Sequence, residues 1–276
     1  MPELPEVETT TRALRPGLLG RTIVGVRAID YVPLVEPLPP EAFAAAVCGR
    51  RVLGVGRRGK YILLRLDDGA VLSIHLRMSG RLHLLPQEAA PDRHTHAVLD
   101  LDDGQALHFY VPRKFGRMRL LTGEEYAVLD GALGPEPLAP TFTAASLQDR
   151  LRARPRARLK ALLLDQRFLA GLGNIYVDEA LFRARLHPLR LAGSLSGGEV
   201  GRLHGAVVEV LGEAITAEGT TLSDGVYLFG SGEAGRFAER LRVYGRTGEP
   251  CIVCGMPVVR QVIAGRGSHF CPRCQV

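Results

Sequence analysis

The sequence predicts an α+β protein with an N-terminal helix, an antiparallel β-rich region, a helical region and a short C-terminal hairpin. Three observations support this class. Short apolar runs separated by turn residues fill positions 22–121. Helical periodicity replaces them beyond a proline-rich stretch at 134–140. Two Cys-x2-Cys pairs then close the chain, which is typical of a small metal-stabilised module.

The first expected helix covers residues 5–14. Pro5 suits the first helical position, where no backbone N–H is needed. Glu6 and Glu8 lie at the positive end of the helix dipole. Because proline disrupts helix interiors, Pro16 and Gly17 are expected to end this helix.

The region that follows alternates short β-rich runs with turns such as Asp-Asp-Gly. Runs at this spacing favour an antiparallel sandwich or barrel. The expected strands are residues 23–29, 52–55, 61–66, 70–75, 81–85, 97–101, 106–109 and 118–121.

The prolines at 134–140 mark the expected interdomain hinge. A helix is expected over 155–166, and a second runs from a capping Asn174 to residue 184. Ser196 and Glu199 form a capping box that opens a third helix, which extends to about residue 218. Residues 219–238 are rich in Gly, Ser and Thr and are expected to form a long, mobile loop.

The C-terminal cysteines have the spacing of a closed zinc site. Cys251, Cys254, Cys271 and Cys274 form C-x2-C-x16-C-x2-C, so four thiolates can surround one Zn²⁺. Four protein ligands leave no open position, so this zinc is expected to be structural. Disulfides are the alternative, which the spacing disfavours. Cys48 is expected to be a core residue.

Charge and composition narrow the class of partner. The chain has 276 residues, 46% of them hydrophobic, and a net charge of +6. Residues 150–190 carry net +7 and residues 240–276 carry net +5, which indicates a polyanion such as DNA. No long apolar run and no signal-peptide pattern is seen, so a cytoplasmic protein without membrane contact is expected.

The N-terminus offers a nucleophile. Removal of Met1 before the small Pro2 would expose a secondary amine beside Glu3 and Glu6. An α-amino group titrates near ~8 and a lysine near ~10.4, so far more of the former is reactive at neutral pH. An amine beside a carboxylic acid suits Schiff-base chemistry on a sugar carbon. The alternative is a proline in a disordered tail.

The chain resembles the formamidopyrimidine-DNA glycosylases over its whole length. The motifs that carry the resemblance are residues 2–8, 58–61, 75–80, 112–116, 171–176, 243–246 and the cysteine module. The resemblance implies an N-terminal β-sandwich with its helix at residues 1–133, a hinge at 134–142, a helix–two-turn–helix domain with a lesion-capping loop at 143–238, and a zinc-finger hairpin at 239–276.

The resemblance also implies a function. The enzyme would flip oxidised purines, 8-oxoguanine and formamidopyrimidines, out of duplex DNA, excise them, and cleave the strand by β,δ-elimination. Pro2 would form the Schiff base, Glu3 would act as general acid and base, Glu6 would orient the N-terminus, and Lys60 would contact the phosphate or the lesion. The protein would act as a monomer, with one structural Zn²⁺.

Further residues would bind DNA. Met78, Arg113 and Phe115 match the residues that fill the space left by the flipped base. The other implied DNA-binding residues are His75, Lys160, Asn174, Tyr244 and Arg266, with Thr220 and Thr221 in the lesion loop. His75 is expected to make a structural hydrogen bond within the sandwich rather than to act as a catalyst.

The sequence departs from the family pattern at Arg77, Val111 and Lys114, where glycine, aspartate and arginine are usual. These changes leave the opposite-base preference open. Two other functions compete. One is an endonuclease VIII-type glycosylase for oxidised pyrimidines, which Leu4 and the trio of Met78, Arg113 and Phe115 disfavour. The other is a non-catalytic zinc-finger DNA-binding protein. The latter would leave the N-terminal amine and its carboxylates without a role.

Overall fold

The computed structural model describes residues 1–27, 29–221 and 234–276. The chain forms two compact units: residues 1–131 with 218–236, and residues 132–217 with 237–276. Among the described residues, no helix is both long enough and apolar enough to cross a membrane.

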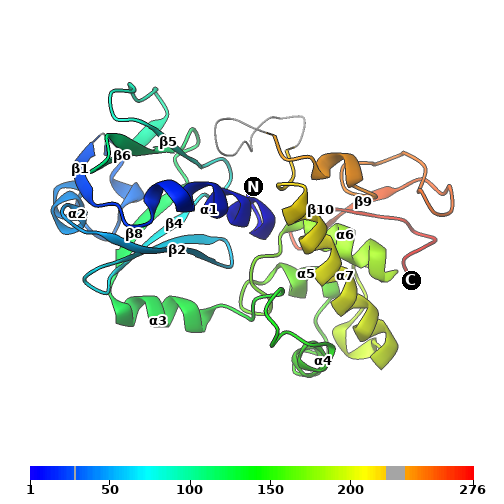
Figure 1. Ribbon diagram of the computed structural model, residues 1–276. Coiled ribbons are helices and arrows are strands. Elements are labelled where there is room, and N and C mark those ends of the chain that lie inside the picture. The colour runs from blue at the N-terminus through cyan, green and yellow to red at the C-terminus, as the bar shows by residue number, and fades with distance from the viewer. Residues whose placement is uncertain (28, 222–233) are drawn as a thin grey trace. The chain divides into compact units, whose positions relative to one another are not determined.

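The first unit is a sandwich of two antiparallel four-stranded sheets (Figure 1). One sheet has the order β1-β6-β7-β5 and the other β2-β3-β4-β8. All eight expected strands are present, which resolves the choice between sandwich and barrel. Their bounds are β1 Ile23–Arg27, β2 Val52–Arg58, β3 Tyr61–Leu66, β4 Val71–His75, β5 Arg81–Pro86, β6 Thr95–Leu101, β7 Gln105–Tyr110 and β8 Arg117–Leu121.

Helices close the sides of this sandwich. Helix α1 (Leu4–Leu18) packs against β2 and β5, which are edge strands of opposite sheets. The short turn η1 (Val32–Leu34) packs on β8, and α2 (Pro40–Val47) packs on β1, at the other two edges. The core between the sheets is built from Val, Leu, Ile and Phe side chains of both sheets and of α1. Each edge is thereby covered, which protects it from pairing with another chain.

The expected end of α1 was wrong. Pro16 lies inside the helix, which continues to Leu18, and the N–H of Leu19 still bonds to the carbonyl of Arg15. Proline at this position removes only one helical hydrogen bond near the C-terminus. Leu14 and Leu18 are both buried in the core, and this burial outweighs the missing bond.

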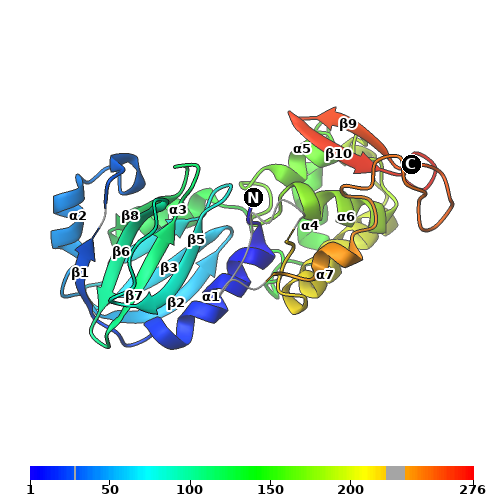
Figure 2. The same cartoon turned by 90° about the horizontal axis from the view of Figure 1, so that it is seen from above.

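The second unit contains the helical region and the C-terminal hairpin (Figure 2). Helix α6 packs against α7, α5 and β10, and α4 packs against α7. The hairpin strands β9 and β10 pair antiparallel, as expected from the sequence. The bounds are α4 Ala144–Arg152, α5 Leu159–Leu164, α6 Asn174–Ala184, η2 Ala192–Ser194, α7 Gly197–Thr216, η3 Phe237–Arg240, β9 Val259–Ile263 and β10 Arg266–Phe270.

Several helical predictions need correction. The helix expected over 155–166 is only α5, and Asn174 is the first residue of α6, whose cap is Gly173. Helices α2, α4 and α3 (Gly123–Ala132) were not predicted. Helix α3 has no apolar stripe that could indicate a helix, and none of its side chains is buried. The one local signal is a capping pair, because Thr122 and Glu125 each accept the other's backbone N–H.

The stretch expected to form the hinge is hydrogen-bonded to the second unit. The Gly134 N–H bonds to the carbonyl of Gln166, and the Ala170 N–H bonds to that of Pro135. A Cβ at Gly134 would lie 2.6 Å from the Phe168 carbonyl carbon, so only glycine allows this close approach.

Candidate active site

The N-terminal residues are buried and held by hydrogen bonds. Pro2 is buried, and Glu3 and Glu6 are each 2% exposed. Glu3 has extended backbone angles and caps α1, and its N–H donates to Glu6 Oε2 at 2.7 Å. The first turn of α1 therefore fixes the direction in which the chain leaves Pro2.

Glu6 also holds a distant segment. The N–H of Thr220 donates to Glu6 Oε1 at 2.8 Å, within the first unit. Thr221 Oγ1 accepts the N–H of Gly235 at 2.8 Å, so residues 220–221 and 235 form the base of a loop. The expected lesion loop above this base, residues 222–233, lies outside the described residues. A single carboxylate thus contacts both the backbone beside Pro2 and the base of that loop.

Lys60 lies in the tight turn between β2 and β3, where Gly59 has φ +54. Its side chain is only 6% exposed. His75 lies near it, at the end of β4, and is paired with Tyr61. Burial, followed by the charges of Arg77 and Lys60, lowers the pKa of His75 to about 3.

His75 is consequently neutral at physiological pH. Its Nδ1 accepts the N–H of Arg77 at 2.9 Å, so its proton resides on Nε2. The ring also meets that of Tyr61 edge to face, with centroids 4.7 Å apart. His75 therefore combines the expected structural hydrogen bond with a donor atom, Nε2–H, that has no partner among the described residues.

The expected intercalating residues lie on two turns of the first unit. Met78 is half-buried in the turn after β4, and Phe115 is 46% exposed in the turn before β8. The Arg113 guanidinium lies 5.4 Å from the centroid of the Phe115 ring. Exposure of an aromatic ring to water is unfavourable, but an exposed ring beside an arginine is suited to stacking against bases.

Strand pairing brings these segments to one end of the sandwich. His75 is paired with Tyr61 on one side and with Arg117 on the other. The turns that carry Lys60, Met78 and Phe115 therefore adjoin the same end of the sheet. Glu8 forms an ion pair of 3.0 Å with Arg57, which places the second turn of α1 near this end of β2.

Lys160 lies in a different environment from the one expected of a phosphate-binding residue. Its side chain is 0% exposed, and its Nζ lies 2.6 Å from Asp178 Oδ1 and 3.2 Å from the carbonyl oxygen of Asn174. Asn174 donates from Nδ2 to the carbonyl of Gly267 at 2.9 Å. Both side chains therefore bond to the protein itself.

Two acidic residues of α6, missed in the sequence, organise the second unit. Asp178 Oδ2 accepts the N–H of His269 on β10 at 2.9 Å. Glu179 accepts the backbone N–H groups of Arg242, Val243 and Tyr244. Burial raises the pKa of Glu179, although these three hydrogen bonds oppose the shift. Two adjacent carboxylates between apolar residues on the expected helix were the available signal, because a buried acid needs a partner.

The pair also positions residues expected to bind DNA. Tyr244 is half-buried and meets the His269 ring edge to face, with centroids 4.8 Å apart. Arg266 begins β10 and is exposed at the hairpin turn. Helix α6 thus anchors the hairpin through the hydrogen bond of Asp178 and the segment with Tyr244 through the hydrogen bonds of Glu179.

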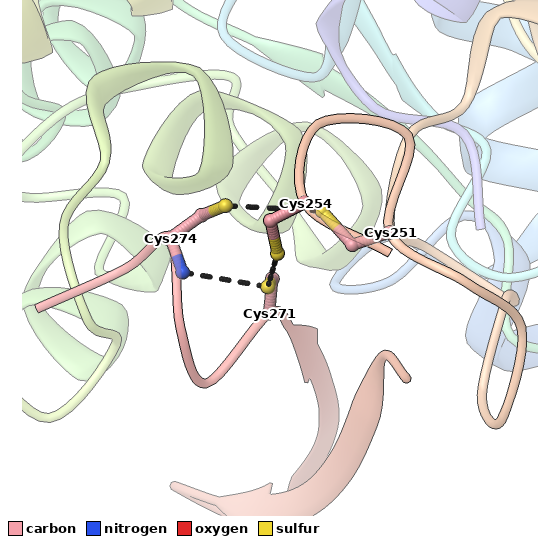
Figure 3. Close-up of side chains that lie close together, drawn as sticks. All are labelled: Cys251, Cys254, Cys271 and Cys274. Atoms are coloured by element: carbon pink, nitrogen blue, oxygen red, sulfur yellow. Dashed lines mark hydrogen bonds between the residues drawn. The ribbon is translucent and has the colours of Figure 1, made fainter. Parts of the chain in front are cut away.

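The four C-terminal cysteines form a structural zinc site (Figure 3). Their Sγ atoms all lie within 4.8 Å of one another, with 3.9 Å between Cys251 and Cys274 and 3.5 Å between Cys254 and Cys271. A tetrahedron with Zn–S bonds of ~2.3 Å requires S–S distances of about 3.8 Å, so the cluster fits this ion. Burial and the neighbouring thiols raise the pKa of Cys274 to about 12, a cost that a bound cation removes.

The fifth cysteine is not part of this cluster. Cys48 is exposed, which corrects the expectation of a core residue. It lies at the C-terminal end of α2, just beyond the last buried residue of that helix, Val47. The burial of Val47 therefore does not extend to Cys48, the next residue in the sequence.

The basic block at 150–190 is only partly available to a partner. Arg183 lies 2.6 Å from Glu213 and Arg190 lies 3.2 Å from Glu199, so these charges are compensated within the unit. Most of the exposed members lie at the end of α4 and between α4 and α5, and the full set is Arg152, Arg154, Arg156, Arg158, Arg167 and Arg185.

Comparisons with known proteins cover the whole chain. Residues 1–118 match the formamidopyrimidine-DNA glycosylase N-terminal domain, residues 133–225 match the H2TH domain of these enzymes, and residues 248–276 match the zinc finger found in FPG and IleRS. The chain is 49% identical to a formamidopyrimidine-DNA glycosylase of a Roseiflexus species, with 100% of each chain covered.

Solved structures agree with the sequence comparisons. The chain is similar to the MutM (Fpg) protein of Thermus thermophilus, with a TM-score of 0.89, 48% identity and coverage of 99% of this chain and 98% of that one. It is also similar to Lactococcus lactis Fpg in complex with DNA containing an abasic site, with a TM-score of 0.90, 35% identity and 99% of each chain covered.

Proposed function

Because the chain belongs to the formamidopyrimidine-DNA glycosylase family, we propose that it excises 8-oxoguanine and formamidopyrimidines from duplex DNA and then cleaves the strand. The observation that carries this proposal is the buried N-terminal turn, in which Glu6 accepts the Glu3 N–H next to the buried Pro2. The ion pair between Glu8 and Arg57 holds this helix against the end of β2 that leads to Lys60. The enzyme acts as a monomer in the bacterial cytoplasm, where its substrate is the chromosome.

Pro2 is the nucleophile once Met1 has been removed. Its nitrogen forms a bond to C1′ of the damaged nucleotide, and the bond from C1′ to the base breaks. The base leaves with the electron pair and takes up a proton. Opening of the sugar ring leaves an iminium between Pro2 and C1′, since a secondary amine has no second proton to lose.

Glu3 transfers protons during these steps. It protonates the sugar ring oxygen as the ring opens, and it is 2% exposed, so bulk water does not compete with it. Glu6 is a positioning residue, because it accepts the Glu3 N–H and so fixes the backbone that carries the nucleophile. The same carboxylate bonds to Thr220 at the base of the lesion loop, with Thr221 beside it.

Strand cleavage follows from the iminium. The positive charge acidifies the C2′ proton, whose removal breaks the bond from C3′ to the 3′-phosphate oxygen. A second elimination releases the 5′-phosphate. Lys60, in the turn between β2 and β3, contacts a phosphate during both steps, and its burial in that turn supports this role. Addition of water to C1′ of the last iminium releases the sugar fragment as an aldehyde, together with a proton, and returns the free Pro2 amine.

Extrusion of the base leaves a gap in the duplex that costs a few kcal/mol of stacking. Met78 and Phe115 enter this gap, and Arg113 bonds to the base opposite it. The cation–π contact between Arg113 and Phe115 holds the two side chains together before DNA binds.

The second unit binds the phosphates that flank the lesion. Asn174 starts α6, whose N-terminal N–H groups attract anions. Tyr244 and Arg266 lie on segments anchored to α6, and the zinc holds the hairpin that bears Arg266. Lys160 acts indirectly, because its buried ammonium bonds to the Asn174 carbonyl and so supports the start of α6.

Borohydride trapping tests the proposal. Wild-type protein and DNA with an abasic site are expected to give a covalent adduct when sodium borohydride reduces the iminium. Pro2→Glu is the matched variant, because a large side chain at this position retains Met1, as mass spectrometry would show. No adduct is expected with it, and an equal yield of adduct would overturn the role of Pro2.

The substrate requires a separate measurement. Single-turnover excision of 8-oxoguanine opposite cytosine should exceed excision of thymine glycol when both duplexes compete. A preference for thymine glycol would instead indicate an endonuclease VIII-type enzyme.

A further inference from the structure

A cavity of about 390 Å³ lies beside the turns that carry Met78 and Phe115, within the first unit. Its lining includes Glu36, Tyr61, His75, Arg77, Arg117 and Arg119. Tyr61, His75 and Arg117 are paired across β3, β4 and β8, so they form one row on the same face of the sheet. Arg119 lies two residues further along β8 on that face.

The cavity contains more cations than the described residues neutralise. Arg77, Arg117 and Arg119 have no ion-pair partner among the residues that the structure describes. Glu36 is the one carboxylate in the described lining. Three guanidinium groups around a single carboxylate leave an excess of positive charge.

Hydrogen-bond donors in this lining also outnumber acceptors. His75 uses Nδ1 as an acceptor for the Arg77 N–H, and its Nε2–H has no acceptor within the part of the chain that the structure describes. The Tyr61 hydroxyl has no hydrogen-bond partner within the described chain. These groups and the guanidinium groups all donate, and the chemistry that they match is an oxyanion.

The backbone at Arg77 supports a role for its side chain. Arg77 has φ +56, in the left-handed region that favours glycine. A side chain at such a position is held at an energetic cost, which is a feature of binding sites. Glycine would relieve this cost but would remove one of the cavity's charges.

Arg117 connects the cavity to the neighbouring turn. Its Nη1 donates to the carbonyl oxygens of Phe115 at 3.1 Å and Gly116 at 2.8 Å. An anion bound to the rest of this guanidinium would therefore also fix the turn that carries Phe115.

We propose that this cavity binds a phosphate group of the DNA strand that passes the Met78 and Phe115 turns, with Arg77, Arg117 and Arg119 as its new ligands. The inference rests on the proposed function, which brings a duplex to these turns. It adds Tyr61 and the three arginines to His75, which the family resemblance already implied.

The test compares wild type with the double variant Arg77→Gly/Arg119→Gln. Fluorescence anisotropy measures the affinity for a duplex with a stable abasic-site analogue at several salt concentrations. Loss of one phosphate contact should weaken binding about 10-fold and reduce the slope of log K against log salt by roughly 0.9. Arg51→Gln is the matched control, since Arg51 precedes β2 at the opposite end of the sheet.

Duplexes with an uncharged methylphosphonate at successive positions locate the phosphate. One position should weaken wild-type binding while leaving the double variant unaffected, which is the signature of a direct pair. A titration with inorganic phosphate alone tests whether the cavity binds free phosphate instead of a phosphate group of DNA. Saturable binding of inorganic phosphate with unaltered DNA affinity would overturn the assignment to DNA.

An unchanged salt slope, or equal losses at every methylphosphonate position in both proteins, would also overturn it. Borohydride trapping with wild-type protein reports on the proposed function separately. Failure of trapping would refute that function and leave the binding result intact, whereas normal trapping with an unchanged slope would refute the cavity alone.

Discussion

The ion pair between Lys160 and Asp178 should dominate the stability of the second unit. The two side chains are 0% and 1% exposed, and 2.6 Å separates the ammonium nitrogen from the carboxylate oxygen. The pair joins α5 to α6, and Asp178 also accepts the His269 N–H of β10. Changing Asp178→Asn keeps the shape of the side chain but leaves a buried ammonium without its counter-charge.

The expected loss follows from the environment. Removing one partner of a buried pair typically costs about 3–5 kcal/mol, because the remaining charge has no water around it. At roughly 3–4 °C for each kcal/mol in a unit of this size, the unfolding midpoint should fall by roughly 10–20 °C. Lys160→Met should cost a similar amount, since it leaves the carboxylate buried alone.

Differential scanning calorimetry of the single variants and of Lys160→Met/Asp178→Asn measures these costs. The double variant has no buried charge at this position, so it should be more stable than the sum of the two single losses implies. Arg183→Met, which breaks a half-exposed pair with Glu213, is the matched control and should cost about 1 kcal/mol or less. Losses below about 1 kcal/mol that add independently would refute the reasoning.

Three further outcomes can be measured. Glu3→Gln should retain DNA affinity but slow base release roughly 100-fold or more in single-turnover assays, and an unchanged rate would contradict its proton-transfer role. Cys254→Ser should lose zinc and weaken DNA binding, whereas Cys48→Ser, outside the cluster, should keep the full metal content in atomic emission analysis. The pKa of His75 falls from 6.5 to about 3 on folding, so its contribution to stability is present above pH 6.5 and is lost as the pH falls toward 3. His75→Gln should flatten this part of the pH–stability curve, and a curve of unchanged shape would show that the histidine is not buried as described.

Features that depend on near neighbours in sequence could be predicted. The strands alternate or run apolar between Asp-Asp-Gly turns, and the capping box of Ser196 with Glu199 opens α7 as expected. The cysteine spacing identified the zinc cluster, because ligand geometry follows directly from two short loops. Helix α3 shows the limit of this reasoning, since it buries no side chain and has no periodic apolar face.

Features that depend on distant partners could not be predicted. Lys160 belongs to a basic block, and a count of charges indicates a surface that binds phosphate. Its partner Asp178 lies 18 residues away, and only folding shows that the ammonium is removed from solvent. The block therefore overstates the charge that DNA can meet, and most of its exposed part is the arginine run at the end of α4 and between α4 and α5.

Glu6 shows how a contact with a distant residue adds a second role to a residue whose first role was predicted. The family resemblance implied a carboxylate that orients the N-terminus, and its bond to the Glu3 N–H fits that role. The other oxygen accepts the N–H of Thr220, 214 residues away, at the base of the loop expected to cover the lesion. One buried side chain thus holds the backbone beside the nucleophile and one end of that loop. A change at Glu6 should therefore disturb both segments together, and no pattern within either segment reveals this dependence.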